Sequence, residues 1–182
     1  MKSHFLFCLF LSVFTAKLTF ADREISSNVE FKIAFGSCGK QTHPLPIFDE
    51  VIKQDPNIFI FLGDNIYGDT NDMDILRKKY QELGTKESYQ HLIENTEVLA
   101  TWDDHDYGQN DAGKHYPHKE ESKEIFLEFF KEPKNSERYT HKGIYHSVYK
   151  KAGNKIIQII LLDNRTFRDD LVRFPKGQKI PG

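Results

Sequence analysis

The sequence predicts an α/β fold built on a parallel sheet, and three neighbouring segments indicate it. Ile58–Leu62 is an unbroken apolar run, which is typical of a strand buried on both faces. Residues 30–35 alternate between polar and apolar side chains and predict an earlier strand. Between the two strands, Pro46 can open a helix whose apolar residues share one face. A strand, a helix and a strand of these lengths predict a parallel crossover unit.

The rest of the chain holds further segments with regular hydrophobic patterns. The clearest helix covers residues 119–131, whose isoleucine and phenylalanine side chains fall on one face. Residues 144–149 alternate and predict a half-exposed strand, whereas residues 155–162 are strongly apolar and predict a second buried strand. We also expect helices at residues 72–83 and 86–95, a short strand at 98–101, and a loop from residue 173 onward.

The first 21 residues have the pattern of a secretory signal peptide. Lys2 gives a positive start, an apolar core runs from Phe5 to Phe14, and Ala21 is a small residue at a cleavage position. This core is shorter than the roughly 20 apolar residues that cross a membrane, so we expect cleavage and no stable membrane anchor. The chain is therefore predicted to consist of a signal peptide, residues 1–21, and one secreted or periplasmic domain, residues 22–182.

Charge and cysteine content limit the partners and the covalent chemistry. The full chain has a net charge of −2, and its first 21 residues hold two lysines and no acids, so the remaining domain carries −4. Without a basic surplus we expect no nucleic-acid binding. Loss of Cys8 with the signal peptide would leave Cys38 without a partner for an internal disulfide. A lone cysteine in an exported protein is either buried and inert or has a task such as metal ligation.

Chemically reactive residues directly follow four of the predicted strands. One such group alone is ambiguous, because Gly, Asn and Asp after a strand are also ordinary turn residues. Four groups on one parallel-type sheet would share an edge and converge there. We therefore expect a single site at this edge. The groups are Cys38, then Asp64 with Tyr67, then the run Asp103-Asp104-His105, and finally Asp163 with Arg165.

The residue types in these groups indicate a metal site that acts on an anion. Clustered carboxylates repel one another unless a cation compensates them, so we expect one or two metal ions. Carboxylates suit Ca²⁺, Mg²⁺ or Mn²⁺, whereas the thiol of Cys38 and the phenol of Tyr67 point to Fe³⁺. Arg165 beside metal ions fits an anionic substrate, above all a phosphate. Two metals would activate a water for attack on a phosphate ester.

Four motifs occur in order between residues 31 and 168. They read Gly36-Ser37-Cys38, Gly63-Asp64-x-x-Tyr67, Thr101-Trp102-Asp103-Asp104-His105-Asp106 and Leu162-Asp163-x-Arg165. Together they closely resemble the alkaline phosphatase D (PhoD-like) group of the calcineurin-like metallophosphoesterases, and the Trp-Asp-Asp-His run followed by an acid is the most specific of them. The resemblance implies a layered α/β/β/α fold and a di- or trinuclear metal site that contains iron and calcium.

The resemblance also implies which residues bind the metals. Asp64 resembles the carboxylate that bridges two metal ions. Cys38 and Tyr67 resemble ligands of the iron. Asp104 would be a further metal ligand, and Asn110 would contact the second metal.

The resemblance also implies catalytic roles for two other residues. His105 would be a proton donor or an oxyanion partner near the leaving group, and Arg165 would be both catalytic and substrate-binding, as a phosphate clamp. Three neighbours have structural alternatives. Asp103 can orient its neighbours, Asp163 is equally well explained as a turn residue, and Trp102 is better explained by packing. The acids at positions 69, 72 and 74 are most simply interpreted as a helix N-terminus.

The chain departs from the family's pattern in its second half. Family members carry a later strand that ends in a Gly-Asp-x-His motif and supplies further metal ligands. This sequence has no such motif and no histidine after Arg165. We therefore expect an apparently truncated fold with only the first half of the sheet system, whose exposed apolar surface and open edge favour self-association.

Two functions are predicted from these observations. The first is an exported, metal-dependent phosphoric ester hydrolase that acts on phosphomonoesters or phosphodiesters through a metal-activated water. The alternative is a catalytically inactive remnant that binds metal or a partner through its open sheet. A site without the later ligands should bind metal weakly, which argues against turnover by this chain alone. Nucleotide binding is disfavoured, because no Gly-rich phosphate loop is present.

Overall fold

The computed structural model describes residues 31–171, so the predicted signal peptide and the loop predicted from residue 173 lie outside the described residues. Within residues 31–171, no helix is long and apolar enough to cross a membrane. The strands are β1 (Ile33–Gly36), β2 (Ile58–Leu62), β3 (Glu97–Thr101), β4 (His146–Ala152) and β5 (Lys155–Leu161). The helices are α1 (Ile47–Lys53), α2 (Met73–Gly84), α3 (Glu87–Asn95), α4 (Asp104–Tyr107) and α5 (Lys119–Phe129), with a 3₁₀ turn at Glu137–Tyr139.

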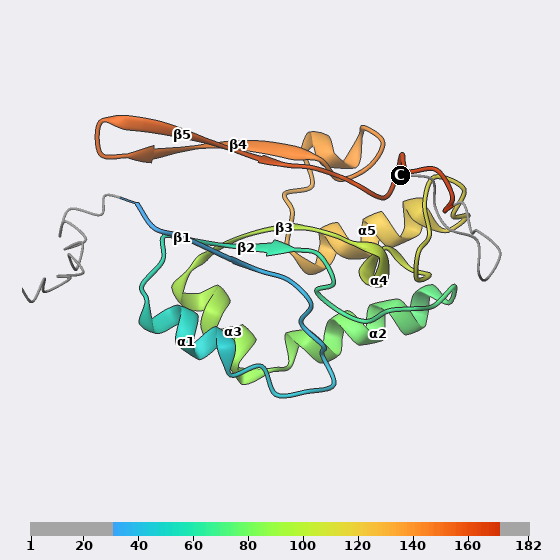
Figure 1. The fold of residues 1–182 in the computed structure, drawn as a ribbon, viewed down its shortest axis with the longest axis horizontal. Helices are drawn as coiled ribbons and strands as arrows, with labels where there is room; N and C mark the ends of the chain where they lie inside the picture. Colours follow the sequence, from blue (N-terminus) through green and yellow to red (C-terminus); the bar gives the residue numbers. More distant parts are fainter. Residues whose placement is uncertain (1–30, 172–182) are drawn as a thin grey trace, which may run out of the picture.

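The strands β1, β2 and β3 form a parallel sheet with β2 in the middle (Figure 1). This arrangement confirms the predicted strand–helix–strand crossover, in which α1 connects β1 to β2. The register places Gly36 opposite Phe61 and Leu62 opposite Thr101, so the three strands end at nearly the same level. The loops that follow them therefore begin at one edge of the sheet.

The strands β4 and β5 form a separate antiparallel hairpin, which lies over one face of the central sheet (Figure 1). The prediction that all four strand ends belong to one parallel-type sheet is therefore wrong. Local hydrophobic pattern does not encode which strands pair, because pairing depends on distant parts of the chain. In Figure 1, β5 nevertheless runs in the same direction as β2, so Asp163 and Arg165 follow it at the end of the molecule where β2 ends.

On the side of the central sheet away from the hairpin lie α1 and α3, and α2 lies on the same side beyond the strand ends (Figure 1). Phe59 and Phe61 of β2 point toward this layer and pack edge-on against Phe48 of α1, with ring centroids 5.8 and 5.6 Å apart. Leu76 and Tyr80 of α2 belong to the same buried core. Helices, parallel sheet and hairpin thus form the α/β/β part of the predicted layered fold, and the predicted α/β class is confirmed. No second helix layer covers the hairpin within residues 31–171.

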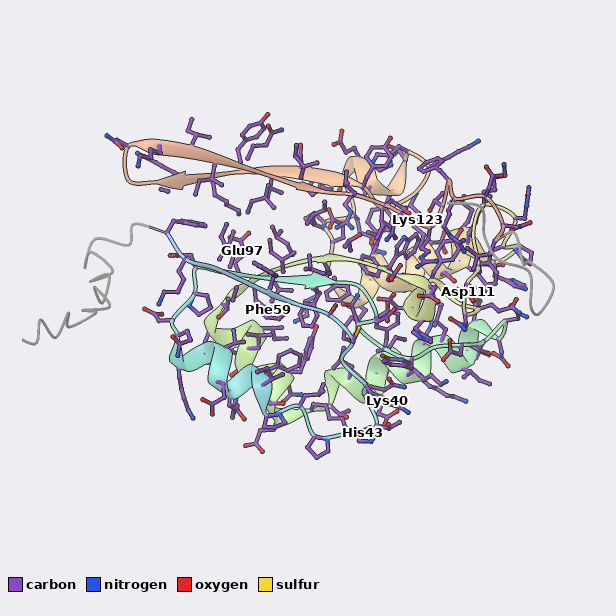
Figure 2. All side chains as sticks on the ribbon, viewed as in Figure 1. Lys40, His43, Phe59, Glu97, Asp111 and Lys123 are labelled. Carbon is purple, nitrogen blue, oxygen red and sulfur yellow. The ribbon has the colours of Figure 1, made fainter. Side chains whose placement is uncertain are left out.

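A second, smaller core joins the two sheets. Ile58, on the other face of β2, packs in one cluster with Ile159 and Leu161 of β5. In Figure 2, Glu97 of β3 lies between the two sheets, where it forms an ion pair with Lys150 of β4. The hairpin is therefore attached to the central sheet by both apolar contacts and charge.

The strand β5 is buried on one face only, which corrects the prediction of a second fully buried strand. Its inward side chains are buried, whereas Ile156 is 75% exposed and Ile160 is 62% exposed. Most residues of the strand are apolar because both of its faces carry isoleucine or leucine side chains. We call the large apolar residues exposed on this side the outer hairpin face; they are Tyr149, Ile156, Ile160 and Leu162.

Candidate metal centre

Three candidate ligands meet where β2 and β3 end. Asp64 follows β2 by two residues, and Asp104 and His105 begin the short helix α4 directly after β3. One ligand atom from each side chain lies within 4.8 Å of the other two. Because β2 and β3 are adjacent and parallel, the loops at their ends bring these residues together.

The loops that carry these ligands touch at the level of the backbone. Gly63 has a φ of +108°, and a Cβ at this position would lie 2.6 Å from the backbone nitrogen of Asp103. Cys38 and Asp64 adopt left-handed backbone conformations, with φ of 61° and 51°, although neither is glycine. Such conformations cost about 1 kcal/mol or more and persist where surrounding contacts impose them, often at functional sites.

Asp64 has the features of a carboxylate that lacks a counter-ion. Its Oδ1 is buried and has no hydrogen-bond partner among residues 31–171, and its Oδ2 accepts from the Sγ of Cys38 at 3.6 Å. Burial raises the pKa of Asp64, and Asp103 and Asp104 raise it further, whereas His105 lowers it. A cation at Oδ1 would satisfy this oxygen and favour the ionised carboxylate.

Cys38 and Tyr67 lie beside Asp64. Cys38 is exposed on the loop after β1. The ring of Tyr67 lies against the imidazole of His105, with centroids 4.2 Å apart. Burial raises the pKa of the Tyr67 phenol, and the nearby Cys38 and Asp64 raise it further. The structure therefore places Cys38 beside Asp64 and Tyr67 beside His105, but Cys38 is not among the three residues whose ligand atoms lie within 4.8 Å of one another.

Asp104 is held in its ionised form by its neighbours, although burial by itself would raise its pKa. The backbone N–H of Asp111 donates to its Oδ2 at 2.9 Å, and together with Arg165 this lowers the pKa. Figure 2 shows Asp111 on the loop after α4. The adjacent Asn110 is exposed, and within the part of the chain that the structure describes its side chain makes no hydrogen bond to the cluster. The role of Asn110 therefore stays a prediction.

His105 is oriented by Asp69, which lies on the loop after β2. The Nδ1 atom of His105 lies 2.6 Å from Oδ1 of Asp69. Burial lowers the pKa of His105, but the hydrogen bond and charge of Asp69, together with Asp64 and Asp104, raise it above its usual value. Because Nδ1 is engaged, Nε2 is the ring nitrogen that can serve a ligand or substrate.

The interpretation of Asp69 as part of a helix N-terminus is wrong. The cap of α2 is Asp72, whose Oδ1 accepts from the N–H groups of Asp74 and Ile75 at 2.9 and 3.2 Å. Asp69 reaches His105 instead, because the preceding Gly68 donates its N–H to the His105 carbonyl at 2.9 Å. The sequence does contain a pattern that could have indicated a site role for Asp69. Gly68-Asp69 repeats the Gly63-Asp64 pair in the loop after the same strand.

Arg165 reaches the centre, but carboxylates occupy its guanidinium. It donates to Oδ1 of Asp103 at 2.5 Å and to Oδ1 of Asp104 at 3.4 Å, and its side chain is 14% exposed. As a phosphate clamp it would have to exchange one of these carboxylates for the substrate anion. Asp103 orients Arg165, in agreement with the structural alternative considered for this aspartate.

One buried carboxylate connects the two loops of the centre. Asp106 is completely buried. Its Oδ1 accepts from the N–H groups of Asp103 at 2.7 Å and Asp64 at 3.3 Å. Its Oδ2 accepts from the backbone N–H of Asn65 at 3.1 Å and from the Asn65 side-chain amide at 2.5 Å. Burial and the charge of Asp64 raise the pKa of Asp106 to about 8, although the hydrogen bonds from Asp103 and Asn65 lower it.

Trp102 and Asp163 serve packing and turn formation. Trp102 is buried against Tyr107 and Phe126, and its Nε1 donates to Oδ1 of Asp163 at 3.1 Å. All other donors to Asp163 come from the turn after β5 and from the segment before β4, so its carboxylate is used by the fold. These donors are the N–H groups of Ile144, Arg165 and Thr166 and the hydroxyl of Thr166.

The assembled donor set fits a metal ion. Asp64 and Asp104 offer carboxylate oxygens, which suit hard cations, and the buried Oδ1 of Asp64 has no other partner among the described residues. His105 offers an imidazole nitrogen. Cys38 and Tyr67 can add a thiolate and a phenolate, which suit a transition metal better than Ca²⁺ or Mg²⁺.

Comparison with known proteins supports the fold. No family model matches the sequence, and no curated protein matches it. The solved structure of PhoD matches with a TM-score of 0.63 at 17% sequence identity, over 77% of this chain and 32% of that one. Similarity at this identity concerns the arrangement of sheets and helices, and the chain spans about a third of the length of PhoD.

Proposed function

We propose that the chain carries the metal centre of a phosphoric ester hydrolase that acts on phosphomonoesters or phosphodiesters. The observation that carries the proposal is the meeting of Asp64, Asp104 and His105 within 4.8 Å. Two carboxylates this close, one with a buried oxygen unpartnered among residues 31–171, favour binding of a cation. The fold similarity to PhoD supports the reaction class.

Each residue of the centre has a task in this proposal. A bound metal would supply a nucleophilic water at neutral pH and neutralise charge on the phosphoryl group. Asp64 and Asp104 hold the metal. His105, with its Nδ1 held by Asp69, uses Nε2 to donate a proton to the leaving alcohol. Arg165 turns from Asp104 toward the phosphate when substrate binds.

We propose iron and calcium as the metals. The thiol of Cys38 adjoins Asp64 and the phenol of Tyr67 adjoins His105, and these donors would suit Fe³⁺. The carboxylate of Asp104, with the side-chain oxygen of Asn110, favours Ca²⁺ as the second ion.

The proposed context follows from the sequence. Residues 1–21 would direct export, so the enzyme would act in the periplasm or outside the cell on a soluble phosphate ester. Neither a membrane anchor nor a nucleic-acid partner is part of the proposal, because the apolar core of the leader is short and the domain is acidic.

Hydrolysis of bis-p-nitrophenyl phosphate and p-nitrophenyl phosphate by the purified chain, supplied with Ca²⁺ and iron, tests the proposal. Turnover above a metal-only blank is the result that supports the proposal. Asp64→Asn should lower the turnover rate more strongly than loss of a residue that only hydrogen-bonds to a metal ligand, which typically costs roughly 10- to 100-fold. Asp72→Asn, which alters only the cap of α2, should retain activity. A folded protein, by circular dichroism, without turnover above the blank would contradict the proposal.

A second candidate is a non-catalytic protein that binds metal or a partner through its open sheet. The outer hairpin face favours it, because apolar side chains such as Ile156 are 75% exposed there. A folded chain that binds metal stoichiometrically but hydrolyses neither ester would select this candidate over the first.

A further inference from the structure

The two loops of the metal centre are separate in the sequence and depend on a connection to keep their ligands together. Asp64 lies on the loop after β2, and Asp104 and His105 lie on the segment after β3. Arg165 bridges Asp103 and Asp104 but does not touch the β2 loop through any hydrogen bond among residues 31–171. Other hydrogen bonds join the two segments farther from Asp64, such as that from the N–H of Gly68 to the His105 carbonyl at 2.9 Å. A group nearer to Asp64 must therefore fix the spacing between Asp64 and Asp104.

Asp106 provides this connection. Its carboxylate can accept about four hydrogen bonds, and four N–H donors fill it. Three of these donors belong to Asp64 and Asn65 on the β2 loop, and the fourth is the N–H of Asp103 on the β3 segment. Asn65 extends the connection, because its side-chain amide also donates to the carbonyl of Thr101, at the end of β3, at 2.9 Å.

The connection also bears on the conformation of Asp64. This residue has a φ of 51°, which side-chain-bearing residues rarely adopt, and its backbone N–H is one of the groups held by Asp106. A Cβ on the preceding Gly63 would lie 2.6 Å from Asp103 of the β3 segment, so the β2 loop has little room to shift. Asp106 is completely buried, which strengthens these hydrogen bonds and makes loss of an acceptor costly.

We propose that Asp106 is the positioning residue of the metal centre, which sets the affinity for metal by holding the Asp64 loop in register with Asp104 and His105. The inference rests on the proposed metal site. Asp106 does not bind the metal itself, because its oxygens are occupied by backbone and amide donors. It acts through Asp64, as outer-shell groups do when they fix ligand geometry.

Replacement of Asp106 by asparagine tests the inference. The change keeps the shape but replaces one acceptor oxygen with an amide that must face an N–H donor. Metal-free wild-type and variant proteins are titrated with Mn²⁺ by calorimetry, after circular dichroism has shown that both are folded. We expect Asp106→Asn to lower the Mn²⁺ affinity by about 10- to 100-fold. Amide hydrogen exchange at Asp64, Asn65 and Asp103 should become faster.

Glu132→Gln is the matched control. Glu132 forms an ion pair with the buried Arg138, so the variant also removes a charge from a largely buried network. Arg138 otherwise donates to carbonyls of Ile144 and Ala100, and none of these residues is a candidate ligand. This variant should lose stability without losing Mn²⁺ affinity.

The outcomes separate the inference from the proposed function. Unchanged Mn²⁺ affinity in folded Asp106→Asn overturns the inference, and so does an equal loss in Glu132→Gln, because the effect would then be general destabilisation. If wild-type protein binds no Mn²⁺, the proposed metal site fails and the inference fails with it. If Asp106→Asn does not fold, Asn65→Ala decides: it removes one of the four donors and should weaken Mn²⁺ binding, and unchanged affinity overturns the inference.

Discussion

The side chain of Asp69 fixes the orientation of the His105 ring. The 2.6 Å contact to Nδ1 determines which ring nitrogen remains for chemistry and adds a negative charge beside the ring. Asp69 reaches this position with a φ of 46°, a conformation that the loop between Gly68 and Asp72 imposes. The pair is half-exposed, so its main effect should be on protonation and geometry.

The variant Asp69→Asn should lower the pKa of His105 in the metal-free protein. In the wild type the hydrogen bond and charge of Asp69 outweigh burial and raise this pKa, so loss of the charge moves it back toward or below the usual value. If the chain is an active hydrolase, the same variant should also lose about 10- to 100-fold in turnover. Titration of the His105 ring by NMR measures the pKa directly.

Asp72→Asn controls for the loss of a nearby acid. It weakens the cap of α2, at a cost of a few tenths of a kcal/mol or less because asparagine also caps helices, and it should leave the His105 pKa unchanged. Equal His105 titration curves for wild type and Asp69→Asn would contradict the orientation assigned here.

Among the secondary-structure elements, the β4–β5 hairpin is held at its base by hydrogen bonds to Asp163. Its carboxylate links the segment before β4, the turn after β5 and the indole of Trp102 at the end of β3. Burial would raise the pKa of Asp163, but the hydrogen bonds from Thr166, Trp102 and Ile144 outweigh it and lower the pKa. The ionised form is therefore the one that the fold stabilises.

Asp163→Asn should destabilise the protein by about 2 kcal/mol at pH 7, because buried donors lose a charged acceptor. A lowered folded-state pKa contributes stability that is present above the unfolded pKa, near 4, and is lost as the pH falls through the folded value. The difference in the free energy of unfolding between wild type and Asp163→Asn should therefore become smaller below pH 4. Urea unfolding at pH 7 and pH 3 measures it.

Asp169→Asn is the matched control for this prediction. Asp169 is paired with Lys114 and also has a lowered pKa, but it is exposed, so the change should alter stability little at either pH. The free energies of unfolding of Asp163→Asn and wild type could instead differ by the same amount at pH 7 and pH 3. That result would show that the charge of Asp163 is not what stabilises the base of the hairpin.

The positions of the central elements could be predicted because local pattern determines them. The buried strand Ile58–Leu62, the preceding strand and the helix between them follow from apolar run, alternation and proline position. The approach of Asp64 to Asp104 then follows from parallel pairing. The separate hairpin and the contact between Asp69 and His105 could not be predicted, because both depend on how distant segments pack. The short helix α4 also escaped prediction, since one turn has no periodicity to detect.

In the molecule as a whole, the three layers leave the outer hairpin face uncovered within residues 31–171. The central sheet is enclosed by helices on one side and by the hairpin on the other, but the outer hairpin face has no covering layer within residues 31–171. Strands β4 and β5 carry lysines and no acids, so this face is apolar with positive charge near the hairpin turn. Apolar area of this kind favours association between copies of a chain.

Ile156→Lys combined with Ile160→Lys should reduce self-association without loss of stability. Both side chains point to solvent, with 75% and 62% exposure, so added charge opposes contact between copies and disturbs no core. Ile159→Lys, one position away but only 8% exposed, should instead unfold the protein, because an unpaired charge would enter the contact between the sheets. Sedimentation velocity at several concentrations measures association, and urea unfolding measures stability. Wild-type protein that remains monomeric over the same range, with the double variant indistinguishable from it, would show that this face does not drive association, so any partner that covers it must be a different molecule.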